Sequence, residues 1–411
     1  MAVAEPAYAK GFTLLGHSER GGRPDAMRAQ YYRDHLYVGH VFSGGFSVLD
    51  VRDPRAMPVQ HFEPPPPGTW NIHLRAADDL LLVIHAKDLW EVFRDESQYY
   101  GGPIGSRLAG AERNWSAGVA VYDIADPANP RRISFLPVDG IGVHRLWYTG
   151  GRWAYASVLP EGYTDNVFAV IDLADPVRPR WAGRWHLPGM HTADGEVPDW
   201  DTVRWRYALH HAIIDGDTAY ASWRDGGPTL LDVSDREAPR LIARRNWSPP
   251  FDGGTHTALP LPGRELLVVA DEAVADRLAD GLKNVWVFDI REPSNPVSIA
   301  TFPHPDEADY GNNGGHFGPH NLHENRPATF VSEYLVFATY QNAGVRAVDI
   351  TDPYRPVEVG AFVPAAPARL VDPRPGRPPV IQTADVTVTD KGLVFFTDYN
   401  AGLYSLQHQG I

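Results

Sequence analysis

The 411-residue sequence contains no cysteine. This absence excludes disulfide bonds, thiolate metal ligands and a thiol nucleophile, so any metal site must use histidine, carboxylate or backbone oxygen. Basic residues are also scarce, because 37 Lys and Arg face 51 Asp and Glu and the net charge is −14. Such a chain lacks the positive surface that tracks phosphates or anionic lipid headgroups. We therefore expect neither nucleic acid nor a membrane as a partner.

Targeting and nucleotide-binding signals are missing as well. No run of about 18 apolar residues occurs, and the N-terminal stretch MAVAEPAYAKGF lacks the basic and apolar regions of a signal peptide. The sequence therefore predicts a soluble, cytoplasmic protein. No GxSxG, HExxH, P-loop or dinucleotide motif stands in a suitable context, which argues against serine hydrolase and nucleotide chemistry. Helical patterns are few, and the best cover residues 87–96 and 273–282.

What the sequence does contain is a repeat of an alternating apolar run, an Asp, and then Asp-Pro-x-x-Pro or a close variant. The clear copies are FSVLDVRDPRAMP, VAVYDIADPANP, FAVIDLADPVRP, TLLDVSDREAP, VWVFDIREPSNP and VRAVDITDPYRP, and GLYSLQ is a degenerate copy near the C-terminus. The alternation predicts a β-strand. The Asp and Pro predict a turn after it, because Pro cannot donate to the ladder and Asp caps the turn with its side chain.

These repeats predict an all-β fold. Upstream of several copies lie units such as LYVGHVFSGG and AYASWRDGG, each of which indicates a strand leading into a Gly-containing hairpin, with another strand before it. Periods of roughly 45 to 60 residues and four strands per repeat indicate a seven-bladed β-propeller with four-stranded blades and long loops on one face. The chain is thus predicted to be one domain, residues 1–411. Its blades are expected near residues 10–60, 68–135, 140–186, 205–246, 253–303, 318–363 and 381–408, with the N-terminal strand closing the ring.

The strand-and-turn pattern seen in FAVID, VAVYD and VWVFD resembles the LVIVD-repeat family over about residues 30 to 405. The resemblance implies a β-propeller but no particular reaction, because propellers host many unrelated activities. Two further groups are similar in architecture only. Carotenoid-cleaving oxygenases are propellers whose blades send histidines to a non-haem iron, and selenium-binding proteins are propellers that carry the cysteine that this chain lacks.

A histidine recurs where the innermost strand of most repeats begins. When the repeats are aligned on their Asp-Pro turns, the position is occupied by His73, His144, His210 or His211, His256 and His320. The flanking residues favour His211 over His210, although one residue of register slip reverses that choice. In the first repeat the position falls on Arg28 or Met27, and in the last repeat on Asp385.

Propeller topology predicts that these histidines meet. Innermost strands surround the central axis and run from one face to the other, so equivalent residues converge at one mouth of the channel. The long insertions lie in loops that open at the same mouth, namely residues 86–117, 157–166, 187–206, 271–284, 304–318 and 364–381. Long loops around converging polar residues are typical of a lidded site, and the aromatic stretch LWEVF…SQYY is a candidate lid.

An all-imidazole cluster favours a divalent transition metal, namely iron, copper, manganese or zinc. We predict that three or four of His73, His144, His210, His211, His256 and His320 bind the ion, which leaves an imidazole for acid–base work and an open coordination position. The predicted catalytic residues are His316, Tyr310, Arg28 and Asp385. His316 and Tyr310 are expected to lean over the mouth, Arg28 to hold an anionic substrate group, and Asp385 to bind metal or orient a histidine. His323 is predicted to be structural.

The leading hypothesis is a metal-dependent oxidoreductase or oxygenase acting on a small organic molecule. A lyase that uses His and Tyr as acid and base is a second hypothesis. A non-catalytic interaction scaffold is the third, in which the histidines are duplicated structural residues that hydrogen-bond to neighbouring blades. The substrate, the metal and the oligomeric state are left open by the sequence.

Overall fold

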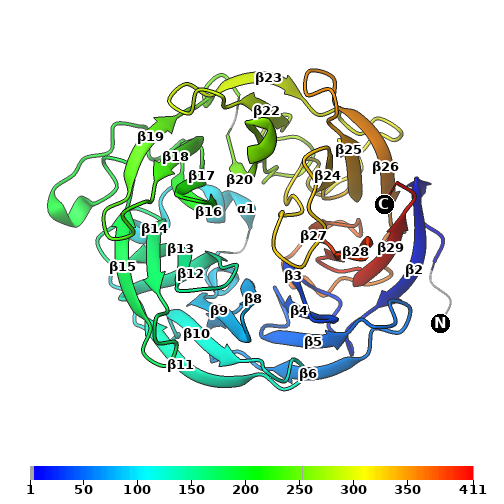
Figure 1. Cartoon of the computed structure of the whole chain (residues 1–411), viewed down its shortest axis with the longest axis horizontal. Coiled ribbons are helices and arrows are strands. Elements are labelled where there is room, and N and C mark those ends of the chain that lie inside the picture. Colours follow the sequence, from blue (N-terminus) through cyan, green and yellow to red (C-terminus); the bar gives the residue numbers. More distant parts are fainter. Residues whose placement is uncertain (1–3, 94, 252, 411) are drawn as a thin grey trace.

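A computed structural model describes residues 4–93, 95–251 and 253–410. Its antiparallel sheets stand around a central axis, with one strand of each sheet next to the axis and another at the rim (Figure 1). This arrangement is a β-propeller, and the predicted all-β class is confirmed. Apolar side chains of facing sheets pack into one large cluster that runs through most of the ring.

Consecutive strands of the chain pair antiparallel and build the sheets in turn. The first sheets along the chain are β3 (Arg28–Tyr32), β4 (His35–Gly39), β5 (Phe46–Asp50) and β6 (Val59–Glu63); β7 (Thr69–Trp70), β8 (Leu74–Ala77), β9 (Leu80–Lys87), β10 (Gly118–Asp123) and β11 (Arg131–Pro137); and β12 (Gly140–Trp147), β13 (Trp153–Pro160), β14 (Val167–Asp172) and β15 (Arg180–Trp185). Next come β16 (Tyr207–Asp215), β17 (Thr218–Arg224), β18 (Pro228–Asp232) and β19 (Arg240–Arg244), and then β20 (Thr255–Leu261), β21 (Leu266–Asp271), β22 (Val285–Asp289) and β23 (Val297–Thr301). Single bridges from β9 to β12 and from β17 to β20 join neighbouring sheets.

The last two sheets take in the N-terminal strands. β24 (Leu335–Thr339), β25 (Val345–Asp349) and β26 (Val357–Val363) are joined at the rim by β1 (Tyr8–Lys10). β27 (Thr383–Val388), β28 (Leu393–Asp398) and β29 (Leu403–His408) are joined by β2 (Phe12–Ser18). Residues 12–18 therefore lie in the sheet of the C-terminal strands, and the pairing of the two ends of the chain closes the ring.

The repeated Asp caps the turn that follows its strand, as predicted. In each clear copy the carboxylate Oδ1 accepts a hydrogen bond from the backbone N–H two residues later, at 2.7 to 3.0 Å. The capping residues are Asp50, Asp123, Asp172, Asp232, Asp289 and Asp349. A carboxylate held this way offers the backbone a turn in place of further strand, so the repeat ends each third strand of a sheet at the same point.

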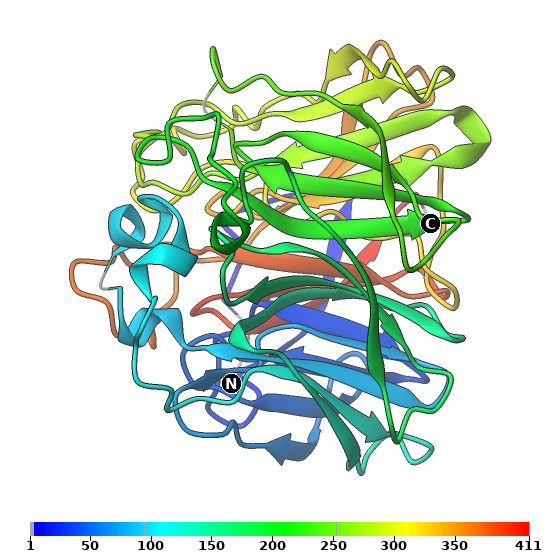
Figure 2. The same cartoon turned by 90° about the vertical axis from the view of Figure 1, so that its left-hand side faces the viewer.

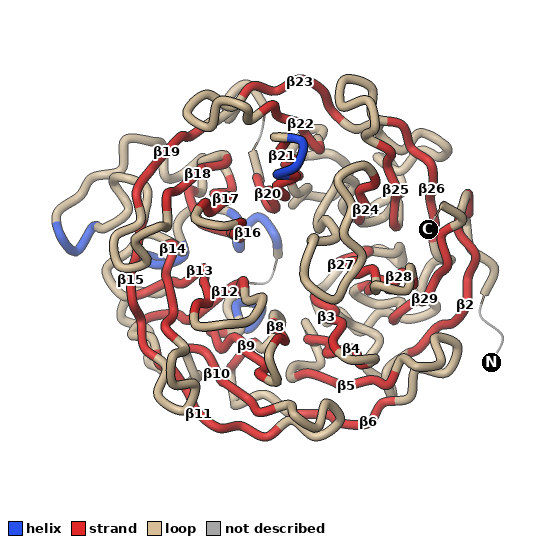
Figure 3. Tube along the Cα trace, in the orientation of Figure 1, coloured by secondary structure: helices blue, strands red, loops and turns tan. Residues whose placement is uncertain are grey.

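The helices are short and lie mostly in the insertions (Figure 3). They are the 3-10 turns η1 (Leu89–Glu91), η2 (Thr192–Asp194) and η3 (Pro262–Arg264) and the helices α1 (Glu96–Tyr100) and α2 (Ile104–Arg107). The predicted helix at 273–282 is wrong: Arg277 and Leu278 have φ of 55° and 57°, and two left-handed residues in a row cannot continue a right-handed helix. Among the described helices, none has the length and apolar character needed to cross a membrane.

The insertions gather at one end of the propeller. In Figure 2 the helical segment around α1 and the loop near residue 370 project from the same face, whereas the turns at the opposite face are short. The Arg374 guanidinium lies 4.1 Å from the centre of the Trp90 ring, so two loops far apart in the sequence meet there. This end of the channel is the covered end.

Ring closure generates a stability prediction at Gly16. A Cβ atom on this residue of β2 would lie 2.6 Å from the carbonyl oxygen of Pro54 and 2.8 Å from Cα of Arg55, which belong to the neighbouring sheet. We expect Gly16→Val to lower the free energy of unfolding by about 1–3 kcal/mol, because backbone must shift to admit the side chain. Urea unfolding followed by tryptophan fluorescence measures this. Thr13→Val, at an exposed position of the same strand, is the matched control, and equal midpoints for both variants would contradict the prediction.

Candidate metal and substrate site

Imidazoles from neighbouring sheets form a continuous arc at the covered end of the channel. Their ring centroids lie 5.2 Å apart for His73 and His144, 4.8 Å for His144 and His210, 3.6 Å for His210 and His256, and 4.4 Å for His256 and His320. Each histidine comes from the innermost segment of a different sheet. The prediction that the repeated histidines converge at one end of the channel is therefore confirmed.

Bulges in the innermost strands aim these histidines at the axis. In β12, Val143 pairs with Val158 and Arg145 with Ser157, so His144 has no partner across the ladder. His256 is left out of the pairing of β20 in the same way. A bulge interrupts the normal alternation of side chains, so a histidine and the residue after it can both face the channel at different depths.

The structure reverses the predicted choice between His210 and His211. His210 stacks on His256 and completes the arc. The side chain of His211 instead lies deeper in the channel, with its Nε2 2.9 Å from Oε1 of Glu324. The cause is an irregular stretch of β16, where the pairing jumps from Tyr207 to His211. The prediction assumed unbroken alternation, and a bulge shifts the register by one residue.

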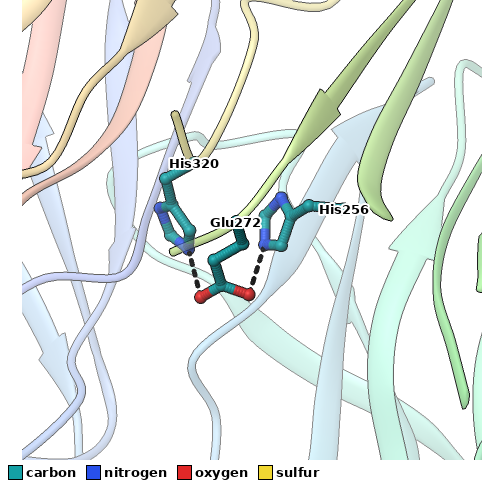
Figure 4. Close-up of side chains that lie close together, drawn as sticks. All are labelled: His256, Glu272 and His320. Atoms are coloured by element: carbon teal, nitrogen blue, oxygen red, sulfur yellow. Dashed lines mark ion pairs between the residues drawn. The ribbon is translucent and has the colours of Figure 1, made fainter. Parts of the chain in front are cut away.

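A carboxylate that the sequence analysis did not single out completes the site. Glu272 follows β21, and its two oxygens lie 3.5 Å from Nε2 of His320 and 3.7 Å from Nε2 of His256 (Figure 4). One ligand atom from each of these three side chains lies within 4.8 Å of the others. All three residues are buried. Two imidazoles and one carboxylate are a donor set that suits iron, manganese or zinc.

Hydrogen bonds fix which imidazole nitrogens point inward. The Nδ1 of His320 lies 2.5 Å from the carbonyl oxygen of Ala384, and the Nδ1 of His210 lies 2.8 Å from the carbonyl oxygen of His256. A carbonyl only accepts, so each Nδ1 carries the proton. Burial lowers the pKa of His320 below its ordinary value, so the ring is neutral near pH 7 and its Nε2 presents a lone pair to Glu272. A histidine that donates its other nitrogen to a carbonyl is typical of metal ligands.

The remaining members of the arc also have nitrogens without a partner. Among the described residues, Nδ1 of His73 and Nε2 of His144 are buried and make no hydrogen bond. Burial lowers the pKa of both rings well below the usual value, so they too are neutral near pH 7. Buried polar atoms nearly always find a partner, and unmatched ones are typical of sites that take an ion, a water or a ligand.

Charged and phenolic groups surround Glu272. The Arg224 guanidinium forms an ion pair with its carboxylate, and the Tyr100 hydroxyl lies 3.4 Å from Oε1. Burial alone would raise the pKa of Glu272, but the Arg224 guanidinium beside it lowers the pKa below its usual value, so the carboxylate is ionised. Arg224 itself has φ of 48°, a left-handed conformation that is rare outside glycine and is typically found at functional sites.

These groups line a small cavity under an aromatic roof. Its volume is about 40 Å³. Because one water needs roughly 10–15 Å³ by this kind of measure, the cavity has room for an ion and one or two water-sized ligands. Its wall includes Trp90, Tyr99 and Tyr100 of the first insertion, and Phe42 and Tyr399 from other sheets. Trp90, Tyr99 and Tyr100 belong to the aromatic stretch that was predicted as a lid, so this stretch does lie against the site.

Two of the predicted catalytic residues, Tyr310 and His316, come from the loop before His320, and they lie in different places. His316 lines the cavity, with its Nε2 3.5 Å from Oδ1 of Asp276. Tyr310 does not lean over the mouth, so that prediction is wrong: its hydroxyl donates to Glu307 at 2.6 Å and its ring stacks near Phe317. The loop turns back on itself and buries the tyrosine against its own blade. His323, predicted to be structural, lies 2.8 Å from the carbonyl oxygen of Phe330 through Nε2.

The other two predicted catalytic residues, Arg28 and Asp385, lie below the histidine arc. Arg28 forms ion pairs with Asp385 at 2.8 Å and with Glu324 at 2.6 Å, so it does not hold a substrate group at the mouth as predicted. Glu324 also pairs with Arg75 at 2.8 Å and Arg145 at 3.3 Å. One buried carboxylate thus pairs with cations from the inner strands β3, β8 and β12.

Sequence reasoning missed Glu272, Arg224, Arg75 and Glu324. None of them stands at the repeated histidine position, and Glu272 and Glu324 have no counterpart carboxylate in most repeats. A signal existed for the first: VVADE places a carboxylate where an apolar second strand enters a long insertion at the mouth. For Glu324 there was none, because it follows an inner segment that hydrogen-bonds to β24 without forming a named strand.

Comparison with known proteins supports the fold. No known family profile matches the sequence, and no curated protein sequence matches it. Among solved structures, the β-propeller domain of Cps50 (Swd1) from Myceliophteria thermophila is similar, with a TM-score of 0.53 and 13% identity over 97% of this chain and 98% of that one. The computationally designed protein Ika8 has a TM-score of 0.50 and 8% identity over 95% and 98%. At such identities the likeness shows the β-propeller fold alone.

The position of Glu324 generates a second stability prediction. We expect Glu324→Gln to lower the free energy of unfolding by about 3–5 kcal/mol, because it leaves several buried guanidinium groups without their shared counter-charge. Chemical unfolding at pH 7 measures the change. Glu237→Gln removes a carboxylate from an exposed pair, Arg180 to Glu237 at 3.8 Å, and should have little effect. A Glu324→Gln midpoint equal to that of this control would show that the channel network contributes nothing to stability.

Proposed function

We propose that this protein is a metal-dependent enzyme, whose ion is held by His256, His320 and Glu272 and which acts on a small organic molecule. The observation that carries the proposal is the contact between His320 and Glu272. The lone pair on Nε2 of a neutral imidazole faces a carboxylate oxygen 3.5 Å away. Two acceptors placed together repel each other unless a proton or a metal ion lies between them, and 3.5 Å is too long for a hydrogen bond and therefore favours a metal ion.

The spacing of the donor atoms fits a bound ion. Ligands bonded at about 2.1 Å with tetrahedral angles are separated by roughly 3.4 Å. The Glu272 oxygens lie 3.5 Å and 3.7 Å from the two imidazole nitrogens, close to that separation and longer than a hydrogen bond. His210 stacks on His256 and is the nearest further imidazole. His211, favoured in the sequence analysis, is not part of the proposed ligand set.

The surrounding residues have roles of their own. Arg224 holds Glu272 in place through Oε2, the oxygen that also lies nearest to His256, and gives the site a further positive charge. The aromatic wall excludes water, which strengthens every charge interaction inside. The Tyr100 hydroxyl, 3.4 Å from Glu272, is the group placed to exchange a proton with a substrate. His316 at the cavity wall is a second candidate for that exchange.

Of the two reaction classes, the donor set favours oxidoreductase or oxygenase chemistry. Two imidazoles with one carboxylate are typical of non-haem iron sites that keep open positions for dioxygen and substrate. When bound, such an ion would supply electron transfer and dioxygen activation. A lyase is the second candidate, supported by Tyr100 beside an ionised carboxylate. The tyrosine first assigned to that role, Tyr310, lies outside the cavity.

We also infer that the ring has seven blades of the LVIVD type. Each clear copy of the repeat supplies the third strand of one sheet, and the C-terminal copy GLYSLQ supplies β29. Seven inner positions then surround the axis, and the histidines occupy five of them, with Met27 and Ala384 at the others. Ala384 is the residue left out of the pairing in β27, so it stands where the other blades carry histidine.

The metal proposal predicts the metal content of specific variants. Wild-type protein reconstituted under anaerobic conditions should carry close to one iron, manganese, copper or zinc ion per chain by elemental analysis. His320→Ala and His256→Ala should each reduce this content by at least tenfold, because each removes one of few ligands. His211→Ala is the matched control, since it removes an adjacent channel histidine outside the ligand set. Equal losses in all three variants, or no metal in the wild type, would contradict the proposal.

The redox reading predicts an open coordination position on iron. Protein loaded with ferrous iron and exposed to nitric oxide without dioxygen should give a new electron paramagnetic resonance signal, and His256→Ala should not. A native metal that is zinc, or iron that does not respond to nitric oxide, would contradict oxygenase chemistry. In that case the lyase reading predicts turnover that is unchanged when dioxygen is removed.

A further inference from the structure

The channel below the histidine arc is filled with buried arginines. Arg28, Arg75, Arg145 and Arg326 are exposed by only 2%, 1%, 1% and 4%. All four surround one carboxylate, with guanidinium nitrogens 2.6, 2.8, 3.3 and 3.6 Å from the oxygens of Glu324. Several different sheets contribute these side chains, so the cluster lies on the axis of the propeller.

The charges of this cluster do not balance. Among the residues that the structure describes, these four guanidinium groups face only Glu324 and Asp385, which leaves an excess of two positive charges among buried side chains. Arginine keeps its proton in proteins, so it cannot relieve the excess by titrating. Burial lowers the pKa of Arg145 to about 10, whereas Arg346, equally buried but matched by two carboxylates, has a raised pKa. The channel is short of negative charge.

Several N–H groups of the cluster also lack an acceptor. Among the described residues, Nε of Arg28, Nε of Arg75, and Nε and Nη1 of Arg145 are buried and make no hydrogen bond. Both terminal nitrogens of Arg28, and Nη2 of Arg75 and of Arg145, already donate to Glu324 or Asp385. The unmatched donors are thus spread over three side chains, with one nitrogen on Arg28, one on Arg75 and two on Arg145. Donors spread in this way suit a spherical anion better than a planar carboxylate, which binds best to two parallel N–H groups of one guanidinium.

We propose that the central channel binds a small inorganic anion of the size of chloride, held by the guanidinium groups of Arg28, Arg75 and Arg145. The anion supplies the missing negative charge and accepts from the unmatched N–H groups. It lies directly beneath the histidine arc, because Arg145 follows His144 and Arg75 is two residues after His73. It therefore weakens the positive field that the arginines would otherwise impose on a cation bound above.

The first test uses the native full-length protein. Protein treated with chelator is desalted exhaustively into a buffer free of small inorganic anions, then denatured, and the released anions are identified by ion chromatography. We expect about one small anion per chain, and the chromatogram separates chloride from phosphate, sulfate and nitrate. Less than a tenth of an anion per chain would overturn the proposal. Because metal has been removed, this outcome is independent of the metal proposal.

The second test locates the anion through variants. Arg145→Met should reduce the released anion at least fivefold, because it removes one positive charge and two unmatched donors. Arg346→Met, at an equally buried arginine that is matched by Glu307 and Glu358, should leave the anion content unchanged. Equal contents in both variants would overturn the assignment.

If Arg145→Met does not fold, the wild type still decides the question. Its thermal midpoint is measured against chloride concentration at constant ionic strength, with gluconate as the replacement anion. A saturable rise in midpoint supports a specific site, because a ligand that binds only the folded state stabilises it by mass action. A midpoint that depends on ionic strength alone overturns the proposal.

Discussion

The buried carboxylate of Glu324 is the interaction on which the centre of this propeller depends. Innermost strands have no further strand to pair with on the side of the axis, so only side chains can tie them together there. Glu324 does this by accepting from Arg28, Arg75, Arg145 and His211, which belong to four different sheets. A charge buried in this way is costly by itself and becomes acceptable only when its partners are in place. The ring of sheets therefore brings the partners of Glu324 together, and Glu324 in turn links the innermost strands of those sheets.

The same strands separate the channel into two layers. Bulges turn consecutive residues toward the axis, so two consecutive side chains of one strand project into the channel at different depths. His144 and Arg145 are an example, and His210 and His211 are another. Burial keeps the upper imidazoles neutral and therefore able to donate a lone pair, while the lower layer contains the arginines that pair with Glu324. One local irregularity thus places two consecutive residues of the same strand at two depths of the channel.

The upper layer of the channel, which contains the histidine arc and Glu272, is enclosed, and this strengthens the interactions between its charges. The aromatic roof and the small cavity keep water from Glu272 and its imidazole neighbours, so charge interactions there are stronger than at the surface. Arg224 and Tyr100 approach the same carboxylate from the insertions and the neighbouring sheet. The insertion that carries Trp90 forms part of the wall of this site and packs on Arg374 from the other end of the chain.

The sequence by itself determined the all-β propeller class, the turns capped by the repeated Asp, and the convergence of most histidines, because these features recur with a fixed period. Only the tertiary structure decided that His210 and not His211 joins the arc, that Tyr310 is turned away, and that Glu272 and Glu324 enter the channel. A bulge moves a side chain by one position without changing the apolar pattern, and a carboxylate that occurs once leaves no periodic signal. Such residues acquire their partners through the closure of the ring, which brings together segments hundreds of residues apart.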